Sequence, residues 1–411
     1  MIIKNLIRKM EANLKIFASV IDPKTKEQID SIVSTEPYSS ESVRIMSDVH
    51  AGRGCVIGFT STTSQGKVNP HLVGNDIGCG MTLVKLGKID INYKKLNGFI
   101  DMIAKHGATS ILPFYKISHK FMYELVEICK SSLHSLRCGA SVDEMQKIMD
   151  TFGTLGGGNH FIEIGKSEAG DLYLVIHSGS RRLGSYIYKY YVSKNSDTIK
   201  KSKSDDIKTM IEDMKKNGLH SQIEERVKEM RASWQSTDIL HESLLYDYFH
   251  DMNVAVEFAK HNREFIAISI CEYLGVNANI RQIEHCVHNY IDDHGIIRKG
   301  ACSAYKDQRV VIPINMRDGI IIGRGIGNSD WNYSAPHGAG RVMSRTEAKK
   351  KLTLEELRES MEGVNTWSLS EDVIDESPSA YKKLEDILPW LAETVDVEGV
   401  LKPVYNYKIA E

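Results

Sequence analysis

The stretch from Pro70 to Met81 constrains the fold of this 411-residue chain more than any other, and it reads Pro-His-Leu-Val-Gly-Asn-Asp-Ile-Gly-Cys-Gly-Met. It places Asp76 and Cys79 three residues apart among glycines. The glycines let the backbone turn tightly, so a carboxylate and a thiol can converge on one cation, or the sulfur can bridge two. Two side chains do not complete such a site, so the fold has to bring further ligands to this loop.

Histidines elsewhere in the chain supply the candidate partners. They lie in polar or glycine-rich segments at residues 156–163, 177–181, 288–290 and 336–341. His160, His177 and His288 add three imidazoles to the carboxylate of Asp76 and the thiolate of Cys79. This set exceeds what one tetrahedral zinc ion needs, but it suits two divalent ions that share the sulfur and flank a phosphate. A single histidine or cysteine is usually structural, so the metal hypothesis depends on all these segments together.

The identity of the metal stays open at this point. Thiolate and imidazole ligands favour zinc by affinity. Manganese is the weakest binder in the divalent series. It would occupy the site only if it were the more available ion and if the site offered an open geometry with more than four ligands.

His337 differs from the other histidines because Gly-Ala-Gly-Arg follows it, ending at Arg341. The glycines allow a phosphate to approach the backbone closely, and the guanidinium adds positive charge. A neutral imidazole in this setting can attack phosphorus and form a phosphoramidate, whose P–N bond is labile enough to pass the group onward. Two neighbouring cations would neutralise the pentacoordinate phosphorus and the departing pyrophosphate. The alternative interpretations are a histidine at a helix start and a sixth metal ligand.

Other polar residues near these histidines could contact a nucleotide or RNA. Asn159 and Glu163 bracket His160, where they would contact a nucleotide or support the ligand. Cations that could hold RNA phosphates, although any one is more often a surface charge, are Arg181, Lys299, Arg341 and Arg345. No Walker-type or dinucleotide-binding glycine motif occurs near these loops, so a bound nucleotide would be held by a different arrangement.

Apolar spacing predicts how the chain is organised. Strand-like runs separated by glycine-bearing loops are predicted at residues 43–46, 55–59, 81–86, 172–176, 309–313 and 319–323. Helices are predicted at residues 27–33, 121–129, 142–149 and 243–273, with a final helical region at 346–394 before a short C-terminal tail. Residues 195–235 carry many charges with apolar residues at helical intervals, and we interpret them as a solvated helical arm.

Composition narrows the class of protein. The 42% hydrophobic content is that of an ordinary globular enzyme. No apolar run approaches the roughly 18 residues of a membrane span. The basic N-terminus lacks a secretory-signal pattern and the seven cysteines form no CxxC pair, so we expect a reducing, cytoplasmic location. The net charge of −2 gives no overall attraction to nucleic acid, so an RNA partner would need a local patch of Lys and Arg.

A series of longer motifs follows in order along the chain. They are Asp-Val-His (48–50), Val-Gly-Asn-Asp-Ile-Gly-Cys-Gly-Met (73–81), Gly-Asn-His-Phe-Ile-Glu (158–163), His-Ser-Gly-Ser-Arg (177–181), His-Asn-Tyr (288–290), Arg-Lys-Gly-Ala (298–301), His-Gly-Ala-Gly-Arg-Val-Met-Ser-Arg (337–345) and Ala-Tyr-Lys (380–382). In this order they resemble the RtcB family of RNA ligases, from about residue 43 to the C-terminus.

The resemblance implies both a fold and an activity. The implied fold is α+β: a single domain over residues 1–411 with a β-sandwich-like core, peripheral helices and a helical insertion at about 195–275. The implied activity is that of a GTP- and manganese-dependent ligase, which joins an RNA 3′-phosphate or 2′,3′-cyclic phosphate to a 5′-hydroxyl in RNA repair or tRNA splicing. GTP would guanylylate His337, the RNA 3′-phosphate would take GMP to give an RNA-ppG end, and the 5′-hydroxyl would displace GMP. We expect a monomer that binds RNA and an activating protein, without membrane contact.

The resemblance also implies roles for individual residues. Asp76, Cys79 and His160 would hold one manganese ion, and Cys79, His177 and His288 would hold the second. Positions that match contacts to the guanylate are Asp48, Asn159, Glu163, Asn289, Pro313, Asn315, Met316, Gly338, Ala339, Gly340, Tyr381 and Lys408. Positions that match phosphate contacts are Arg181, Lys299, Arg341 and Arg345.

One segment departs from the family pattern. Where the family usually has Pro-Gly-Ser-Met-Gly, this chain has Pro-Ile-Asn-Met-Arg at 313–317, which loses two glycines and a serine hydroxyl. We expect a reshaped loop, in which Asn315 could replace a hydroxyl contact. Two hypotheses of other classes also fit the residues: a dinuclear phosphoesterase or nuclease that acts on RNA ends, and a protein that holds damaged RNA without turnover.

Overall fold

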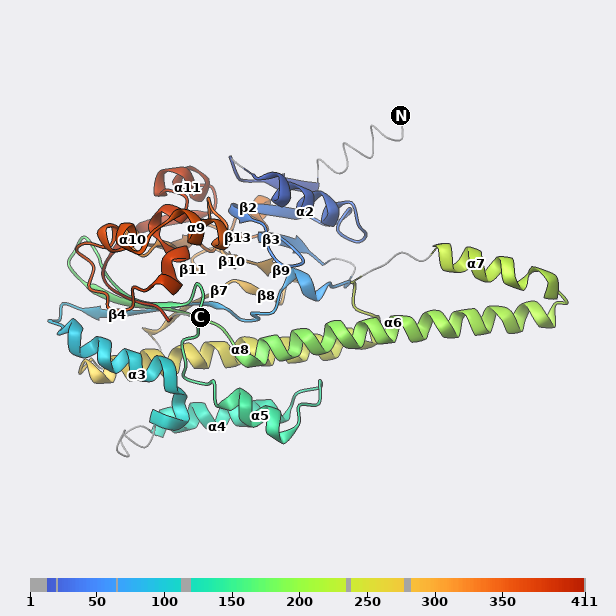
Figure 1. Cartoon of the computed structure of the whole chain (residues 1–411), viewed down its shortest axis with the longest axis horizontal. Coiled ribbons are helices and arrows are strands. Elements are labelled where there is room, and N and C mark those ends of the chain that lie inside the picture. The colour runs from blue at the N-terminus through green and yellow to red at the C-terminus, as the bar shows by residue number, and fades with distance from the viewer. Residues whose placement is uncertain are drawn as a thin grey trace.

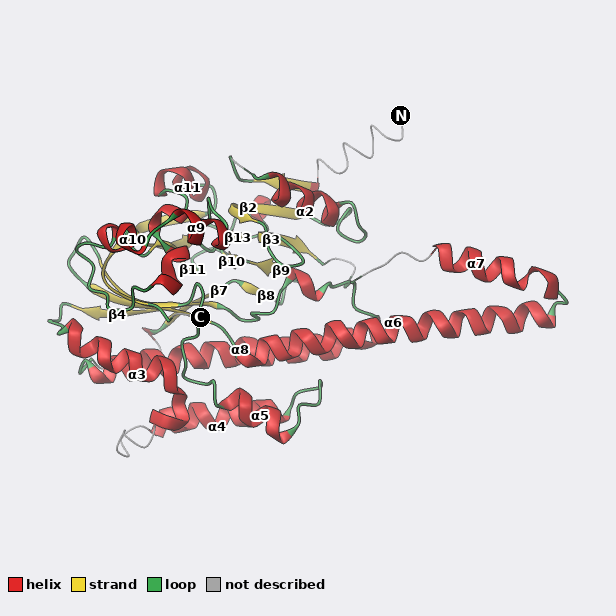
Figure 2. Cartoon of the chain, in the orientation of Figure 1, coloured by secondary structure: helices red, strands yellow, loops and turns green. Residues whose placement is uncertain are grey.

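The computed structural model describes residues 13–19, 21–63, 66–111, 120–233, 238–276 and 282–409. Two large sheets and a set of helices form the body of the protein, and a pair of helices projects from it (Figure 1). Figure 2 shows the strands on one side of the two longest helices. This is the α+β fold that the resemblance implied.

The larger sheet has seven strands, each antiparallel to its neighbours. In spatial order they are β11 (Arg309–Asn315), β12 (Gly319–Gly325), β14 (Val395–Tyr407), β5 (Phe161–Lys166), β6 (Leu172–Ser178), β4 (Gly80–Gly87) and β7 (Glu284–Val287). Branched residues dominate the middle of β11 and β12, which read Val-Val-Ile and Ile-Ile-Ile there. Such runs are typical of strands buried on both faces.

The smaller sheet has five strands. Its order is β1 (Leu14–Ile16), β2 (Val43–His50), β3 (Ile57–Thr62), β9 (Ile296–Lys299) and β8 (Asn289–Ile291), and only β1 and β2 run parallel. A separate two-stranded pair joins β10 (Ala301–Ser303) to β13 (Ser334–Pro336). Because β7 to β10 follow one another closely in the chain, this segment connects the larger sheet to the other two.

A layer of helices packs against the larger sheet. Its central member is α8 (Glu242–Tyr273), which contacts β4 and β6. The other members that contact α8 are α3 (Tyr93–Ile111), α4 (Lys120–His134) and the first part of α6 (Arg182–Lys216), and α5 (Val142–Met149) packs on α4 and α6.

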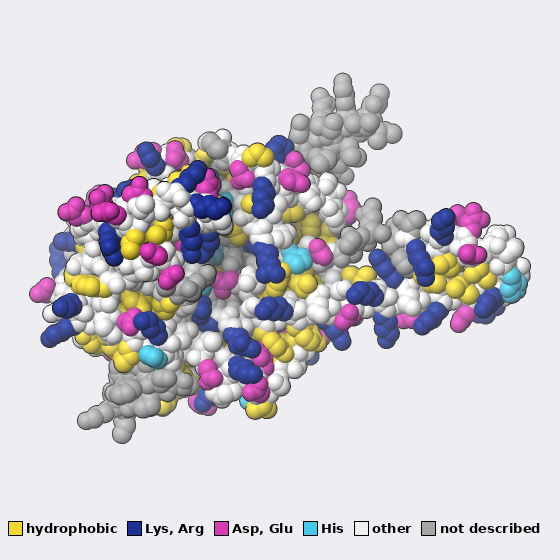
Figure 3. All heavy atoms as spheres, in the orientation of Figure 1, with side chains coloured by type: hydrophobic (Ala, Val, Ile, Leu, Met, Phe, Trp, Pro, Cys, Tyr) yellow, Lys and Arg dark blue, Asp and Glu magenta, His cyan; other side chains and the backbone are white. Residues whose placement is uncertain are grey.

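The projecting arm consists of the second part of α6 and of α7 (Ile223–Ser233), which turns back along it (Figures 1 and 3). The last buried residue of α6 is Asn195, whose side chain bonds to the backbone of residues 239 and 241. Beyond it, cations pair with acids of the same helix, as Lys208 does with Asp205 at 3.4 Å. The predicted solvated arm is therefore confirmed for the part of 195–235 that is described.

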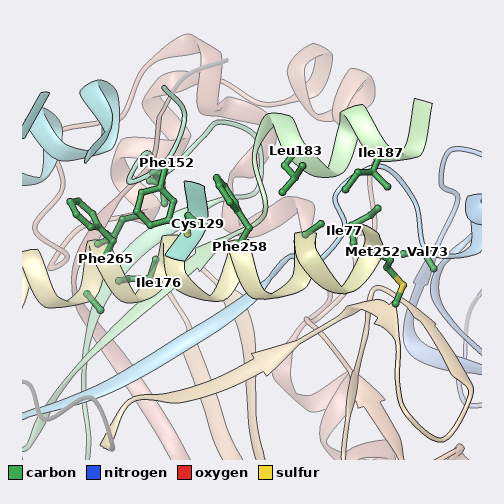
Figure 4. Close-up of a cluster of buried hydrophobic side chains, with 14 of the residues drawn as sticks. Val73, Ile77, Cys129, Phe152, Ile176, Leu183, Ile187, Met252, Phe258 and Phe265 are labelled. Atoms are coloured by element: carbon green, nitrogen blue, oxygen red, sulfur yellow. The ribbon is translucent and has the colours of Figure 1, made fainter. Parts of the chain in front are cut away.

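The main core lies between α8 and its neighbours (Figure 4). Phe258 and Phe265 on α8 face Phe152, with ring centroids 5.3 and 5.5 Å away. Ile176 from β6 and Leu183 from α6 complete the contact. Burial of these apolar side chains fixes α8 against the sheet.

The remaining helices are short and cover the edges of the sheets. They are α2 (Pro23–Val33), α9 (Arg345–Lys351), α10 (Leu354–Ser360) and α11 (Leu384–Leu391). Asp22 caps α2 by accepting from the backbone N–H of Thr25, and Pro23 occupies the first turn, where its missing N–H costs nothing.

The predicted strands and helices are confirmed, with one shift and one error. The strand predicted at 55–59 begins at Ile57. The region 346–394 is helical as predicted, divided into three short α-helices and two 3-10 helices, whereas the predicted C-terminal tail is wrong because residues 395–407 form β14. The segment at about 195–275 contains both the arm and the core helix α8. Among the described residues, no helix combines the length and apolar character that a membrane span needs.

Candidate functional site

Four neighbouring strands bring the predicted metal ligands to one end of the larger sheet. Cys79 and His160 immediately precede β4 and β5, whereas His177 lies near the end of β6 and His288 follows β7. Since neighbouring strands are antiparallel, the starts of β4 and β5 lie beside the ends of β6 and β7. The register pairs His177 with the residue after His160 and with the second residue after Cys79.

The ligand atoms form two groups that share the sulfur of Cys79. Its Sγ lies 3.2 Å from Nε2 of His177, which lies 3.3 Å from Nε2 of His288. The same Sγ lies 3.4 Å from Nε2 of His160, which lies 3.2 Å from Oδ2 of Asp76. Ligands with metal bonds of about 2.0–2.3 Å stand roughly 3–4 Å apart, so these donors are spaced as two sulfur-bridged ions require.

Burial sets the protonation of these ligands. It holds the pKa of His177 and of His288 well below the usual histidine value, so both rings are neutral and offer a lone pair. It raises the pKa of the Cys79 thiol, so a divalent cation has to supply the charge that stabilises the thiolate. Burial alone would raise the pKa of Asp76, but the hydrogen bond from His160 and the nearby charge of Arg181 hold it below the usual range. Sulfur, nitrogen and carboxylate donors together fit a divalent transition metal.

Hydrogen bonds on the far side of the rings orient them. Nδ1 of His177 donates to the carbonyl of Asn159 at 3.1 Å, so its Nε2 faces the sulfur without a proton. His160 differs, because its Nδ1 accepts from Nη1 of Arg181 at 3.0 Å and its proton then lies on Nε2, where Asp76 accepts it. An ion bound at Nε2 of His160 would take the place of that proton.

A buried arginine on α8 ties two ligand strands together. Nη1 of Arg263 donates to the carbonyls of Gly78 and Ser178 at 2.9 and 2.8 Å. These carbonyls belong to the neighbours of Cys79 and His177 in the chain. The side chain is fully buried, so each bond is shielded from water and fixes the strand ends firmly.

The residues on either side of Arg263 extend this connection. Asn262 accepts from the backbone N–H of Gly153 at 2.7 Å and donates to Oγ of Ser178 at 3.2 Å. Glu264 accepts from Nε2 of His285, on β7, at 3.2 Å. Sequence reasoning missed all three residues. The signal that could have found them is a run of Asn, Arg and Glu directly before the mostly apolar second part of a predicted helix.

His337 follows β13 and points toward the ligand groups, with its ring centroid 4.8 Å from that of His288. Its Nδ1 donates to Oδ2 of Asp48 at 2.6 Å. The same oxygen accepts from the backbone N–H groups of His337 and Gly338 at 3.1 and 3.2 Å. Since Nδ1 carries the proton, Nε2 keeps its lone pair for attack on an electrophile.

Gly340 permits this close approach. A Cβ at this position would lie 2.6–2.8 Å from backbone atoms of Asp48, and the backbone has φ of +80°. Both features exclude a larger residue, so the turn after His337 can lie directly against β2 only with glycine here.

A pocket with a volume of ≈ 350 Å³ opens next to these groups. Nearly every site residue that the sequence predicted lines it, and the exceptions are Asp48, His160 and Arg181. These three stand one layer behind the surface, because Asp48 contacts His337, His160 contacts Cys79 and Arg181 contacts His160. The structure therefore brings the predicted residues of the site to one place.

Glu376 lines the pocket and holds three other lining side chains in place. It accepts from the hydroxyl of Tyr381 at 2.6 Å, from Nζ of Lys408 at 2.8 Å and from Nη1 of Arg341 at 3.3 Å. Burial opposes its ionisation, but the charges of Lys408 and Arg345 lower the pKa of Glu376 to about 2. The tyrosine and the lysine are thereby held facing the pocket.

Glu163 and Asn406 form a second pair of polar residues there. Oε2 of Glu163 accepts from Nδ2 of Asn406 at 2.9 Å. Oε1 of Glu163 and Oδ1 of Asn406 are buried and have no hydrogen-bond partner among the described residues. Burial raises the pKa of Glu163 to about 8. Two buried polar atoms without partners, one on a carboxyl that burial keeps protonated and one on an amide, suit a ligand that offers both an acceptor and a donor.

The four cations predicted at phosphate positions differ in accessibility. Lys299 lines the pocket, but its Nζ donates to the carbonyls of Arg53 and His71 at 2.7 and 2.9 Å. Arg341 is held by Glu376, and Arg181 lies behind the pocket. The side chain of Arg345 is 45% exposed, so it stands at the rim.

The altered segment 313–317 covers the end of β11 and the first residues of the tight turn to β12. Oδ1 of Asn315 accepts from the backbone N–H groups of Arg317 and Asp318, and its Nδ2 donates to Asp318 at 2.7 Å. The side chain of Asn315 therefore closes the turn while the residue lines the pocket. Ile314, which replaces a family glycine, is buried in the second core cluster.

Glu376 and Asn406 were also missed by sequence reasoning. Asn406 stands two residues before Lys408, which directly follows β14, so strand alternation could have placed both side chains on the same side of the chain. Glu376 had a weaker signal, an acidic pair five residues before Tyr381.

Comparison with known proteins agrees with this arrangement. Residues 29–409 match the family model described as tRNA-splicing ligase RtcB. The RNA-splicing ligase RtcB of Escherichia coli (strain K12) is 29% identical over 404 residues, which cover 90% of this chain and 91% of that protein. The RNA-splicing ligase RtcB2 of Escherichia coli (strain ATCC 25922) is 26% identical, covering 87% and 84%. The tRNA-splicing ligase RtcB of Pyrobaculum aerophilum is 24% identical, covering 84% and 82%.

Proposed function

The chain belongs to the RtcB family, and from this premise we propose that it is an RNA ligase that uses GTP and two manganese ions. The proposed reaction joins an RNA 3′-phosphate, or a 2′,3′-cyclic phosphate that is first opened, to a 5′-hydroxyl in RNA repair or tRNA splicing. The observation that carries the proposal is the position of His337 beside the two ligand groups, with Nδ1 bonded to Asp48.

In the first proposed step, Nε2 of His337 attacks the α-phosphorus of GTP. An N–P bond forms while the bond to the pyrophosphate oxygen breaks, so the histidine carries GMP. The ring then bears positive charge, which the carboxylate of Asp48 stabilises through Nδ1. Manganese ions, when held by Asp76, Cys79 and the three ligand histidines, would withdraw charge from the phosphates.

The next two steps transfer the activated group and restore the enzyme. An oxygen of the RNA 3′-phosphate attacks the phosphorus on His337, the P–N bond breaks, and an RNA-ppG end forms. The 5′-hydroxyl of the second RNA then attacks the phosphorus of the former 3′-phosphate, loses its proton, and displaces GMP. Both displacements depend on position more than on covalent chemistry by the protein, so a buried, rigid pocket supports them.

The pocket offers groups for the guanylate and for RNA. We assign Glu163, Tyr381 and Lys408 to the guanylate, since they line the pocket and two of them are held there by Glu376. Further guanylate contacts are proposed for Asn159, Asn289, Pro313, Asn315, Met316, Gly338, Ala339 and Gly340. Lys299, Arg341 and Arg345 supply positive charge along the same pocket for RNA phosphates.

The proposal is tested by covalent labelling. The purified protein, incubated with GTP that is radiolabelled at the α-phosphate and with Mn²⁺, should become labelled without RNA. His337→Ala should abolish the label, whereas His220→Ala, on the exposed arm, should label as the wild type does. An unlabelled wild type, or a labelled His337→Ala variant, would exclude the proposed step.

Joining of RNA separates this function from the two other hypotheses. The ligase should join a 3′-phosphate end to a 5′-hydroxyl end only with GTP present. Cleavage of RNA ends without GTP would instead indicate a phosphoesterase or nuclease, and retention of RNA without joined product would indicate a binding protein.

A further inference from the structure

A second cavity lies beside the reaction pocket and also has a volume of ≈ 350 Å³. It shares Arg345 and Glu376 with the lining of the first, so the two cavities adjoin at these residues. Its floor includes Gly158, two residues before the ligand His160, and one wall is the face of α9 that carries Thr346, Lys349 and Lys350. We call it the α9 groove.

Most acidic residues of the groove are buried and paired with cationic side chains of the protein. Asp375 and Glu376 are both 3% exposed. Glu376 is bonded to Lys408 and Arg341, as described above, and Asp375 lies 3.4 Å from Arg345. Asp372 at the rim is the remaining carboxylate of the lining.

The lysines of α9 are more exposed and less firmly paired than these acidic residues. Nζ of Lys349 stands 3.7 Å from Asp375, beyond hydrogen-bond distance, and the side chain is 51% exposed. Lys350 is exposed and has no hydrogen-bond or ion-pair partner among the described residues. In Figure 3, dark blue side chains gather where Figure 1 places α9.

A charged helix face is usually only solvated, and the arm illustrates that case. There, lysines stand three residues from an aspartate of the same helix, as Lys208 does from Asp205. On α9 the single acidic residue, Glu347, is paired with Lys351. Lys350 therefore presents uncompensated charge on the groove beside the pocket, and Lys349 has only its long ion pair with the buried Asp375.

We propose that the α9 groove binds the phosphodiester backbone of the RNA strand next to its reacting end, with Lys349 and Lys350 as phosphate contacts. The inference rests on the proposed ligase function and adds the path by which RNA leaves the pocket. Such contacts hold RNA in register without reading its sequence. The same chemistry serves the strand that ends in a 3′-phosphate and the strand that begins with a 5′-hydroxyl.

The test measures RNA binding and its salt dependence for the double variant Lys349→Ala/Lys350→Ala. Each lost contact to single-stranded RNA should reduce the slope of log affinity against log salt by about 0.7, hence by about 1.4 for two. Between 50 and 200 mM salt, wild-type affinity should then fall about sevenfold more than that of the variant. Two labelled oligonucleotides are compared, one with a 3′-phosphate and phosphorylated at its 5′ end, and one with a 5′-hydroxyl and a 3′-hydroxyl.

Three controls distinguish a loss of charge on α9 from a general loss of surface charge, from misfolding and from a failure of the ligase proposal. The matched control Lys200→Ala/Lys201→Ala removes two exposed lysines from the arm and should keep the wild-type slope. Lys349→Arg/Lys350→Arg should also keep it, because the charge is retained. All variants should be guanylylated without RNA as the wild type is, which shows that they fold and tests the ligase proposal independently.

The strand whose binding weakens identifies the RNA end that occupies the groove. Unchanged affinity and slope for both oligonucleotides in the double alanine variant would overturn the inference, even if guanylylation proceeds. So would an equal loss in the arm control, since it would show that any lysine pair contributes alike.

Discussion

Asp48 uses one carboxylate oxygen to hold both the ring and the backbone of His337. We predict that Asp48→Asn lowers the rate of guanylylation at least about 100-fold, with the dissociation constant of GTP nearly unchanged. The amide oxygen can keep the backbone bonds, but it has no charge to stabilise the ring once phosphorus is attached. Single-turnover labelling measures the rate, and Asp330→Asn, on the surface, is the matched control. A rate within about threefold of wild type would contradict the assigned role.

Glu163 makes stability depend on pH. Burial raises its pKa from 4.5 to about 8, so between these values the folded protein holds a proton that the unfolded chain releases. The free energy of unfolding should therefore fall as pH rises through this window, by up to about 1.4 kcal/mol per pH unit. Glu163→Gln stays neutral and lacks this contribution. Urea unfolding of wild type and variant at pH 6 and pH 8 measures it, and parallel pH dependences would show that Glu163 titrates normally.

At the scale of elements, β14 is a long strand that the sequence pattern did not predict. Residues 395–407 alternate imperfectly, and Gly399 and Pro403 normally interrupt strands. The structure absorbs both with register shifts, one opposite β12 and one beside Pro403 opposite β5. Local pattern predicted a tail because the pairing partners lie far away in the chain. By contrast, the patterns of α4, α5 and α8 are local, and they were predicted.

The same scale explains the role of α8, whose Arg263 bonds to backbone next to two ligands. We predict that Arg263→Lys weakens Mn²⁺ binding about 10- to 100-fold, since an ammonium cannot reach both carbonyls in the fixed geometry of a guanidinium. Calorimetric titration of metal-free protein measures the affinity.

The control for this variant is Arg182→Lys, which alters an exposed arginine paired with Glu144. Denaturant unfolding of both metal-free proteins separates lost stability from lost affinity. Unchanged Mn²⁺ affinity in a folded Arg263→Lys protein would show that Arg263 does not position the metal ligands and that α8 serves only the packing of the core.

At the scale of the molecule, the site draws on residues from Asp48 to Lys408. Ordered motifs allowed the ligands and His337 to be predicted, because their chemistry is visible in single residues. Glu376 and Arg263 were not predicted, because each acts through partners that only the fold brings near. The arrangement of the pocket thus depends on long-range strand pairing, which no local window contains.

The projecting arm is a large part of the described chain that contributes no residue to the pocket. No residue from 196 to 231 is buried, and Asn195 bonds directly to the backbone of Ile239 and His241. Residues 197 and 238 are therefore held near each other without the arm.

We predict that replacing 198–237 by a short Gly-Ser linker leaves guanylylation within about twofold of wild type, and the melting temperature within a few degrees, because little apolar area is lost from the core. Labelling with GTP and calorimetry test this, with the linker inserted into the intact arm tip at Gly218 as control. A deletion protein that no longer takes GMP would show that the arm supports the pocket, and the solvated-arm interpretation would have to be replaced.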